Sequence, residues 1–448
     1  MLGNALVAPS STPYATSSRV MHMADLRIVD HSKDRYHSLA ISSVWELAKI
    51  RKARVLVVGA GALGNEVCKN LAMMGVKQIV VLDRDTVEVA NLSRSVFFRE
   101  KDHGRAKTEA IAERLQELNP DVEILKLTGD LDSALGLGLI RRMDIVFSCL
   151  DSRLARRSVN RMCGKMSKPW VDGAMEDLLG EVAVYVPGRG PCYECTLSQA
   201  EKARIAEAAS CRGIALRNLS LGKVPTTPTM GSIVAAIQVQ EGIKILNGKP
   251  VNSLAGKRLV INCNINDFYV TASERNEECE GHEQFDTVAE VSEFTSSGTS
   301  ARQVLERFKR ESGEDGFVEL GREVVIEFRC PGCGGAEVLG EPIRKVDEAR
   351  QCCPQCGTTR ELETTHVVTN KDSWSEWPLS RLGIPKLDVI EVRGAQSVAW
   401  YELSGDGVEL GFELRPVVQP EVPRDVLPSV QDDAQSKHLE ALPVQKSA

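Results

Sequence analysis

The sequence contains no apolar run that approaches the roughly 20 residues of a membrane-spanning helix. Its first 30 residues lack a basic segment followed by an apolar core, so they predict no secretory signal. No internal repeat is found in the chain. We therefore expect residues 1–31 to form a flexible polar leader, and we expect a cytoplasmic protein with no membrane partner.

The composition narrows the class of protein further. The net charge of -7 does not favour a nucleic-acid partner. A length of 448 residues leaves room for two or three domains, and 42% hydrophobic residues are enough to build cores. Thirteen cysteines without a secretory signal argue against a disulfide framework and for metal sites, buried thiols or catalysis.

Residues 54–99 begin with the pattern of a nucleotide-binding βαβ unit. An apolar strand at residues 55–58 leads into a GxGxxG turn formed by Gly59, Gly61 and Gly64. A helical pattern follows, and a second apolar strand at residues 78–82 ends at Asp83, 19 residues after the last of these glycines. Such glycines allow close approach to phosphate, and a carboxylate at the second strand end accepts hydrogen bonds from ribose.

The polar run that follows suits an oxidoreductase poorly. It carries Asn91 and Arg94, and Lys107 follows after a further short segment. Guanidinium and ammonium groups neutralise phosphate charge, so together these residues favour a polyphosphate ligand over a nicotinamide. Any one of them alone would be better explained as a solvated surface residue.

Five segments, in chain order, resemble the motifs of ubiquitin-activating enzymes and their bacterial relatives ThiF, MoeB and HesA. They read GAGALG, LDRDTVEVANLSR, GRAKTEAIAERLQELNP, DIVFSCLDSRLARRSVN and PWVDGAMEDLLGEVAVYVPGRGPCYEC. The resemblance extends over about residues 35–282, somewhat more than half of the chain, and it is closest to the bacterial type.

The resemblance implies an α/β fold, with a Rossmann-like adenylation domain whose mixed sheet is parallel in its first half. It also implies ATP-dependent adenylation of the C-terminus of a ubiquitin-like or sulfur-carrier protein. The residues that match the family's nucleotide site are the three glycines, which line the turn, Asp83, which would bind ribose, and Asn91, Arg94 and Lys107, which would contact the phosphates.

Asp151 matches the family's magnesium ligand. It follows an apolar strand at residues 145–150, and so lies at a carboxyl strand end beside the crevice of an open α/β sheet. One carboxylate together with phosphate oxygens suffices for Mg²⁺. Without the resemblance, a helix-capping role for Asp151 would be the better interpretation.

The chain departs from the family's motifs at a few positions. The family often begins RYxRQ, and its second arginine reaches into the partner subunit, whereas this chain reads Arg35-Tyr36-His37-Ser38. Arg35 or another basic residue would have to take that role. Ser152 and Ser95 replace an asparagine and a glutamine, and neither change removes a charge that the chemistry needs.

Two groups of cysteines have the spacing of zinc sites. The first combines Cys192, Cys195, Cys279 and His282, in which the histidine stands where the family usually has a cysteine. Between its halves lies a strand-like segment, residues 258–270. The second group, a predicted zinc ribbon at residues 330–356, combines Cys330, Cys333, Cys353 and Cys356, with 19 residues between the inner cysteines. Cys352 leaves the choice of ligand open in the second group.

Another cysteine, Cys211, lies in the segment that matches the family's crossover loop, where several members carry the acceptor cysteine. The neighbouring Arg212 would favour a thiolate, which could attack the acyl-adenylate to form a thioester. A helix-end cysteine without chemistry is an equally good interpretation. Four further cysteines lie in apolar or helical contexts and are expected to be core residues: Cys68, Cys149, Cys163 and Cys263.

We expect an adenylation domain at residues 32–283, a linker at 284–300, a C-terminal module at 301–416 and a disordered tail at 417–448. The module shows a helical pattern at residues 301–310 and strand patterns at 323–329, 389–392 and 397–403. The expected cofactors are ATP, Mg²⁺ and Zn²⁺, and the expected assembly is a homodimer, with a conjugating-enzyme-like acceptor as a further partner.

Two other function classes compete with this hypothesis. An NAD(P)-dependent oxidoreductase explains only the glycine turn and Asp83. A catalytically inactive, zinc-bearing scaffold explains the missing arginine at Ser38 but leaves Arg94, Lys107 and Asp151 without a cause.

Overall fold

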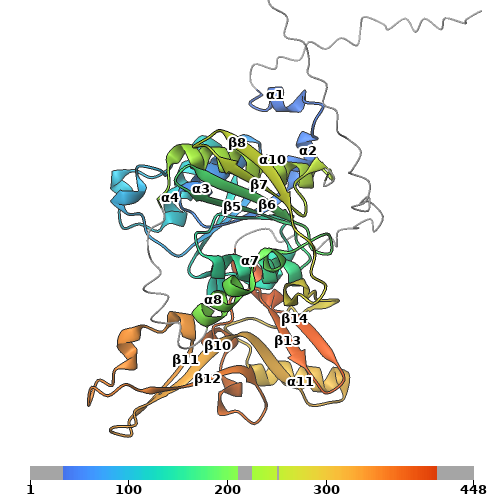
Figure 1. Ribbon diagram of the computed structural model, residues 1–448. Helices are drawn as coiled ribbons and strands as arrows, with labels where there is room; N and C mark the ends of the chain where they lie inside the picture. Colours follow the sequence, from blue (N-terminus) through green and yellow to red (C-terminus); the bar gives the residue numbers. More distant parts are fainter. Residues whose placement is uncertain (1–33, 210–224, 250–251, 411–448) are drawn as a thin grey trace, which may run out of the picture. The chain divides into compact units, whose positions relative to one another are not determined.

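The computed structural model describes residues 34–209, 225–249 and 252–410 (Figure 1). The chain divides into two compact units, one ending at Ile41 and the other beginning at Ser42. In the first unit, the described residues form the short helix α1 (His37–Ala40). All other elements belong to the second unit.

An eight-stranded sheet forms the larger part of the second unit, in the order β3-β2-β1-β4-β5-β6-β7-β8. Its first five strands are parallel, and from β5 onward each strand is antiparallel to its neighbour. The strands are β1 (Arg54–Val58), β2 (Gln78–Asp83), β3 (Glu123–Thr128), β4 (Ile145–Ser148), β5 (Trp170–Glu176), β6 (Leu179–Tyr185), β7 (Lys257–Asn262) and β8 (Asp267–Ala272). The expected Rossmann-like fold with a sheet that is parallel in its first half is therefore confirmed.

Helices cover both faces of this sheet, as parallel strands require. In β1, Val55 and Val57 pack into the core that includes α3, α4 and α10, whereas Leu56 and Val58 pack against α6 and α7 on the other face. Figure 1 shows α10 and α7 on opposite sides of the sheet. The helices of this part are α2 (Leu47–Lys52), α3 (Ala62–Met73), α4 (Lys107–Leu118), α5 (Leu131–Ala134), α6 (Leu137–Arg141), α7 (Arg153–Lys165), α8 (Gln199–Ala209) and α10 (Pro228–Leu246).

The segment 258–270, expected to be strand-like throughout, forms two strands joined by a tight turn. Strands β7 and β8 pair in antiparallel register, from Lys257 opposite Ala272 to Asn262 opposite Asp267. Asn266 adopts a φ of 55° in the turn, a conformation that asparagine tolerates better than most residues. The apolar and β-branched residues on both sides of the turn obscured it in the sequence.

A second sheet of six strands contains the order β11-β10-β13-β14-β9, with β12 also paired to β10. Helix α11 (Ala301–Ser312) packs against it through Val304, Leu305 and Phe308, and begins with a capping box between Ser300 and Gln303. The strands are β9 (Val288–Glu290), β10 (Phe317–Arg329), β11 (Ala336–Pro342), β12 (Glu361–Val368), β13 (Val389–Arg393) and β14 (Val398–Glu402). Strand β9 lies within the stretch that the sequence predicts to be a linker, and it pairs in parallel with β14.

Short 3-10 turns connect these elements. They are η3 (Val89–Asn91), η4 (Glu100–Asp102), η5 (Tyr193–Thr196), η7 (Glu280–His282), η8 (Ile343–Lys345), η9 (Glu348–Gln351), η10 (Ser373–Glu376), η11 (Leu379–Leu382) and η12 (Ser404–Leu410). Among the helices that the structure describes, none is both long and apolar enough to cross a bilayer.

Buried ion pairs join β14 to the end of α6. The carboxylate of Glu402 is fully buried and lies 2.9 Å from Arg141 Nη1 and 2.6 Å from Arg142 Nη2. Glu290 of β9 pairs with the same two arginines at 3.1 and 3.5 Å, but its side chain is 45% exposed. The two carboxylates thus share partners and differ in burial.

Replacing Glu402 with alanine should lower the free energy of unfolding by about 3–5 kcal/mol, because the change leaves the buried Arg142 and the half-buried Arg141 with only the exposed carboxylate of Glu290. Glu290→Ala is the matched control and should cost less than about 1 kcal/mol, since water screens that pair. Thermal unfolding of both variants measures the difference. Equal shifts in melting temperature would contradict the importance of burial here.

Candidate nucleotide site and metal centres

The glycine turn lies between β1 and α3, and sterics require two of its three glycines. Gly59 has a φ of 97°, and a Cβ there would lie 2.5 Å from the carbonyl oxygen of Cys149. A Cβ on Gly64 would overlap the carbonyl oxygen of Gly59. A Cβ on Gly61, by contrast, would meet no atom within 4 Å. The turn is therefore closely packed against β4 on one side and open at Gly61, where a ligand could approach the backbone.

Asp83 is fixed beside this turn at the end of β2. Its Oδ2 accepts a hydrogen bond from Ala60 N at 2.6 Å, and its Oδ1 accepts one from Asp85 N at 2.7 Å. Burial raises the pKa of Asp83, while the charge of Lys107 and the two backbone donors oppose that rise. A carboxylate held in this way keeps lone pairs available for ribose hydroxyls.

Lys107 begins α4, and its ammonium group lies in the same site. The Nζ atom is 2.8 Å from Asp85 Oδ2, and the residue is only 8% exposed. Backbone bonds hold the start of α4 against the end of β2, since Lys107 N donates to the carbonyl of Asp85 at 3.0 Å. The structure therefore brings together the predicted residues Asp83 and Lys107, with Asp85 between them.

Asn91 and Arg94 lie on the segment between β2 and α4, in and after the turn η3. Asn91 Oδ1 accepts a hydrogen bond from Glu88 N at 2.9 Å, and Arg94 Nη1 donates to the carbonyl of Ala90 at 2.7 Å. Both bonds are local to that segment. The amide nitrogen of Asn91 and the rest of the Arg94 guanidinium are thus not used by these two bonds.

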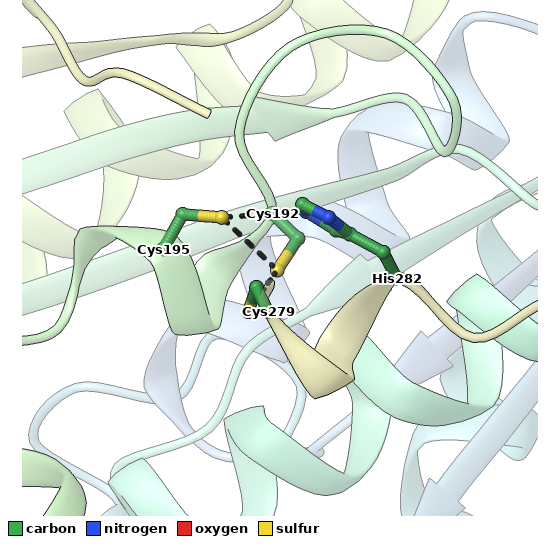
Figure 2. A group of neighbouring side chains, drawn as sticks. All are labelled: Cys192, Cys195, Cys279 and His282. Carbon is green, nitrogen blue, oxygen red and sulfur yellow. Dashed lines mark hydrogen bonds between the residues drawn. The ribbon is translucent and has the colours of Figure 1, made fainter. Parts of the chain in front are cut away.

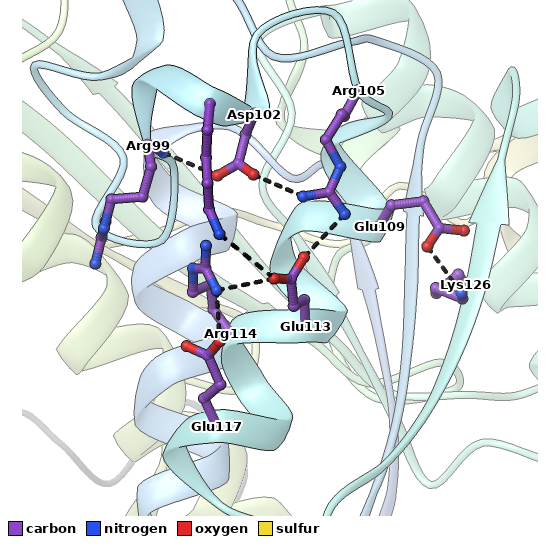
Figure 3. A network of polar contacts seen from close by, with 9 residues as sticks. Arg99, Asp102, Arg105, Glu109, Glu113, Arg114, Glu117 and Lys126 are labelled. Carbon is purple, nitrogen blue, oxygen red and sulfur yellow. Dashed lines mark hydrogen bonds and ion pairs between the residues drawn. The ribbon is translucent and has the colours of Figure 1, made fainter.

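A polar network around Asp102 and Arg105 was not predicted from the sequence (Figure 3). The fully buried carboxylate of Asp102 accepts hydrogen bonds from Arg99 N at 3.0 Å and from Arg105 Nη1 at 2.7 Å. Arg105 also donates to Glu113 of α4 at 2.9 Å. These contacts fix the residues that lead into Lys107. In the sequence, the charges look like an ordinary solvated surface, and only the spacing of Asp102 and Arg105 hints at a pair.

Asp151 lies between β4 and α7 and is exposed. Its neighbour Ser152 caps α7, accepting a hydrogen bond from Ala155 N at 3.4 Å, so the capping role falls to Ser152. The pKa of Arg156 is raised by Asp172 and, more weakly, by Asp151, although burial opposes the rise. Asp151 thus lies at the carboxyl end of β4, within electrostatic range of a buried arginine.

Arg156 itself was not singled out from the sequence. Its Nε lies 3.2 Å from Asp172 of β5, and it also donates to the carbonyl of Leu150, the residue before Asp151. Asp172 accepts a further bond from Ser148 Oγ at 2.7 Å. The buried pair ties the loop of Asp151 to the next strand, a link that no local sequence signal reveals.

The first cysteine group assembles as predicted (Figure 2). The ligand atoms of Cys192, Cys195, Cys279 and His282 all lie within 4.8 Å of one another. Burial and the charge of Arg275 lower the pKa of His282, which favours the neutral imidazole that metal binding requires. Three thiols and one imidazole around a common centre fit tetrahedral zinc.

Helix α7 supports this candidate metal site. Glu194, between the first two cysteines, accepts hydrogen bonds from Arg157 at 3.1 Å and from Arg161 at 2.9 Å. Asn160 accepts one from Tyr193 N at 3.0 Å. The helix that begins just after Asp151 therefore carries the cysteine turn on its later residues.

The second group brings together Cys330, Cys333, Cys353 and Cys356, again within 4.8 Å. Hydrogen bonds from Thr358 lower the pKa of Cys356 to about 6, and backbone donors of Gln355 and Cys356 lower the pKa of Cys353, which favours the thiolate form of these two cysteines. The pKa of Cys333 is raised to about 11. The thiol of Cys352 instead lies 3.3 Å from the carbonyl of Gly357. In this geometry Cys353, and not Cys352, completes the group.

The remaining cysteines are fully buried, partly buried or outside the described residues. Cys68 and Cys163 are fully buried, and burial raises the pKa of Cys68 to about 12, so both are core residues as expected. Cys149 and Cys263 are partly buried beside the core. Cys211 lies outside the described residues. Arg35 belongs to the first unit, and its role stays a prediction.

The ThiF family matches residues 34–281 of this chain. Among curated relatives, SUMO-activating enzyme subunit 2 of Dictyostelium discoideum is 36% identical over 148 residues, which cover 33% of this chain and 22% of that protein. Adenylyltransferase and sulfurtransferase MOCS3 of Bos taurus is 28% identical over 285 residues, 63% of this chain and 60% of that protein. The chain therefore spans less than two thirds of the length of either relative.

Among solved structures, MccB of E. coli with ATP is 24% identical and covers 53% of this chain and 68% of its own, with a TM-score of 0.44. The family match is the stronger finding, because it takes in β1 to β8 and the residues that line the glycine turn. It covers more than half of the chain, and the protein belongs to the ThiF family.

Proposed function

We propose that the protein uses ATP to adenylate the C-terminal carboxylate of a ubiquitin-like or sulfur-carrier protein. The observation that carries this proposal is the position of four features at the carboxyl ends of neighbouring parallel strands. Asp83 ends β2, the glycine turn follows β1, and Asp151 follows β4, while Lys107 lies against Asp85 just after β2. Ligands of open α/β sheets bind at these strand ends.

In the proposed reaction, an oxygen of the substrate carboxylate forms a bond to the α-phosphorus of ATP. The bond from that phosphorus to the bridging oxygen breaks, and pyrophosphate leaves with the bonding electrons. Asp83 accepts hydrogen bonds from the ribose, and the backbone N–H groups at the start of α3 face the phosphates. Lys107, Arg94 and Asn91 stabilise the charge that develops on the leaving group.

Asp151 would hold magnesium, which would supply positive charge to the phosphates. A single exposed carboxylate at a strand end fits an ion that takes most of its other ligands from phosphate and water. The names of the two curated relatives, an activating-enzyme subunit and an adenylyltransferase, support the same reaction class. The two cysteine groups would hold structural zinc, since neither presents an open coordination position in its donor set.

ATP–pyrophosphate exchange with Mg²⁺ and candidate proteins that end in Gly-Gly tests the proposal. Exchange that requires such a protein is the expected result. Hydride transfer with NAD(P) would favour an oxidoreductase, and failure to bind ATP would favour an inactive scaffold. Both outcomes would contradict adenylation.

We further propose that the Cys211 thiolate attacks the carbonyl carbon of the acyl-adenylate, which forms a thioester, breaks the bond to the phosphate oxygen and releases AMP. The assembly in this proposal is a homodimer that delivers its product to a conjugating-enzyme-like acceptor. The presence of both a SUMO-activating subunit and a sulfurtransferase among the relatives leaves sulfur transfer as the second candidate. Arg35 is the basic residue that we propose for the place of the family's missing arginine.

Cys211→Ala should abolish a thiol-labile adduct with the substrate protein, while exchange activity stays within about twofold of the wild type, because the thiol acts only after the adenylate forms. Gel analysis with and without reductant measures the adduct. Cys263→Ala is the matched control. An unchanged adduct in Cys211→Ala would rule out this acceptor, and loss of exchange would show that Cys211 does more than accept the acyl group.

A further inference from the structure

Asn65 is a fully buried polar residue in the first turn of α3, directly after the last glycine of the GxGxxG turn. Its Nδ2 donates hydrogen bonds to the carbonyls of Ala60 and Gly61, each at 2.9 Å. Its Oδ1 accepts a hydrogen bond from Phe97 N at 3.0 Å. Both donors and the acceptor of the amide are therefore used, as a buried amide requires.

These three bonds connect two segments that both belong to the proposed phosphate site. The first two bonds hold the backbone of the glycine turn. The third reaches 32 residues along the chain to Phe97, three residues after Arg94. Phe97 and Phe98 are buried in the core, and on the other side of Arg94 the side chain of Asn91 bonds to its own turn.

The Arg94 segment is thus anchored at both ends, and the Asn65 side chain bonds both to the glycine turn and to Phe97 of that segment. A buried amide is costly without partners, and a leucine of similar size could fill the same space with apolar contacts. A purely local role would need only the bonds to Ala60 and Gly61, which lie just before the start of α3. The bond to Phe97 is what makes a local role insufficient.

We propose that Asn65 is a positioning residue that sets the Arg94 segment against the glycine turn, so that the guanidinium and the N–H groups of the turn address the same phosphates. The inference rests on the proposed adenylation. It also identifies the position after the third glycine as part of the nucleotide site in this chain, although Asn65 itself need not touch ATP.

Asn65→Leu and Asn65→Ser both remove the bond to Phe97 N, and either variant is sufficient for the test if it folds. The expected result is a rise in the KM for ATP of about tenfold in pyrophosphate exchange, since small displacements of positioned groups cost one to two orders of magnitude. Asn119→Leu is the matched control. Asn119 is 2% exposed, and its side chain donates at 2.8 Å to the carbonyl of Ala72, which lies at the opposite end of α3 from Asn65. This control should lose stability but keep the KM of the wild type.

A double-mutant cycle with Arg94→Ala separates positioning from general stability. If Asn65 acts through Arg94, the Asn65 variant should change the KM by less than about twofold once Arg94 is gone, because coupled residues are not additive. An equal effect in both backgrounds, or an equal rise in Asn119→Leu, would overturn the inference. Wild-type protein that shows no exchange at all would instead refute the proposed function, so the two failures are distinguishable.

Discussion

Asp151→Ala is expected to lower ATP–pyrophosphate exchange by at least about 100-fold, a loss typical of removing a group that stabilises charge in the transition state. The carboxylate lies at the end of β4, and the adjacent strand β1 leads into the glycine turn. Because Ser152 caps α7, the loss of Asp151 should leave that helix intact. The effect should therefore appear in activity and not in stability.

The measurement is exchange at several magnesium concentrations, together with the melting temperature. Asp267→Ala provides a matched control, because Asp267 is an exposed aspartate on β8, at the edge of the same sheet. Asp151→Ala should stay inactive at every magnesium concentration, whereas the control should follow the wild-type curve. Full exchange activity in Asp151→Ala would refute the magnesium role and leave the residue as a surface aspartate.

The glycine turn and the two strands beside it could be predicted from the sequence because their signals are local. The strand expected at residues 55–58 is β1 (Arg54–Val58), and the strand expected at 78–82 is β2 (Gln78–Asp83). Both are buried apolar runs: β1 is followed by Gly59, whose φ is 97°, and β2 ends at Asp83, whose carboxylate bonds to the backbone of the glycine turn. The geometry of the turn fixes the spacing of its glycines, so the turn can be recognised in a single sequence.

Contacts between distant residues could not be predicted in this way. The bond from Asn65 to Phe97, the pair of Arg156 with Asp172 and the burial of Glu402 against Arg141 each depend on where two separate segments meet. A charged or amide side chain in a sequence looks the same whether its partner is water or a buried group. Strand β9 was missed for a related reason, since its three residues become a strand only by pairing with β14.

Cys353→Ser is expected to remove one of two bound zinc ions and to unfold the ribbon at residues 330–356. The hydrophobic cluster beside this ribbon is small, with four buried members: Val325, Phe328, Ile343 and Val346. So small a core would leave a bound zinc ion as the main source of stability, since structural zinc in small domains contributes about 10 kcal/mol or more. Removal of one thiolate should therefore release both the ion and the local fold.

Cys352→Ser is a control that differs by a single position. The Cys352 thiol lies against Gly357 O, outside the four-atom group, so this variant should keep two zinc ions per chain. Zinc content by metal analysis and hydrogen exchange of β10 to β12 measure the two effects. Loss of zinc from Cys352→Ser, or retention of zinc in Cys353→Ser, would contradict the assignment of Cys353 as the ligand and of Cys352 as a residue outside the group.

The same pair of variants tests whether the ribbon affects the nucleotide site. The ribbon's four cysteines lie in the segments between β10 and β12. Asp83 ends β2, Asp151 follows β4 and Lys107 begins α4, all in the part of the chain that forms the eight-stranded sheet. Among the residues that the structure describes, the ribbon's thiols make no hydrogen bond to any of those three. If the ribbon serves only to recruit a partner, Cys353→Ser should keep magnesium-dependent ATP binding and lose turnover with the protein substrate or acceptor. Loss of ATP binding in that variant would instead show that the ribbon stabilises the adenylation fold itself.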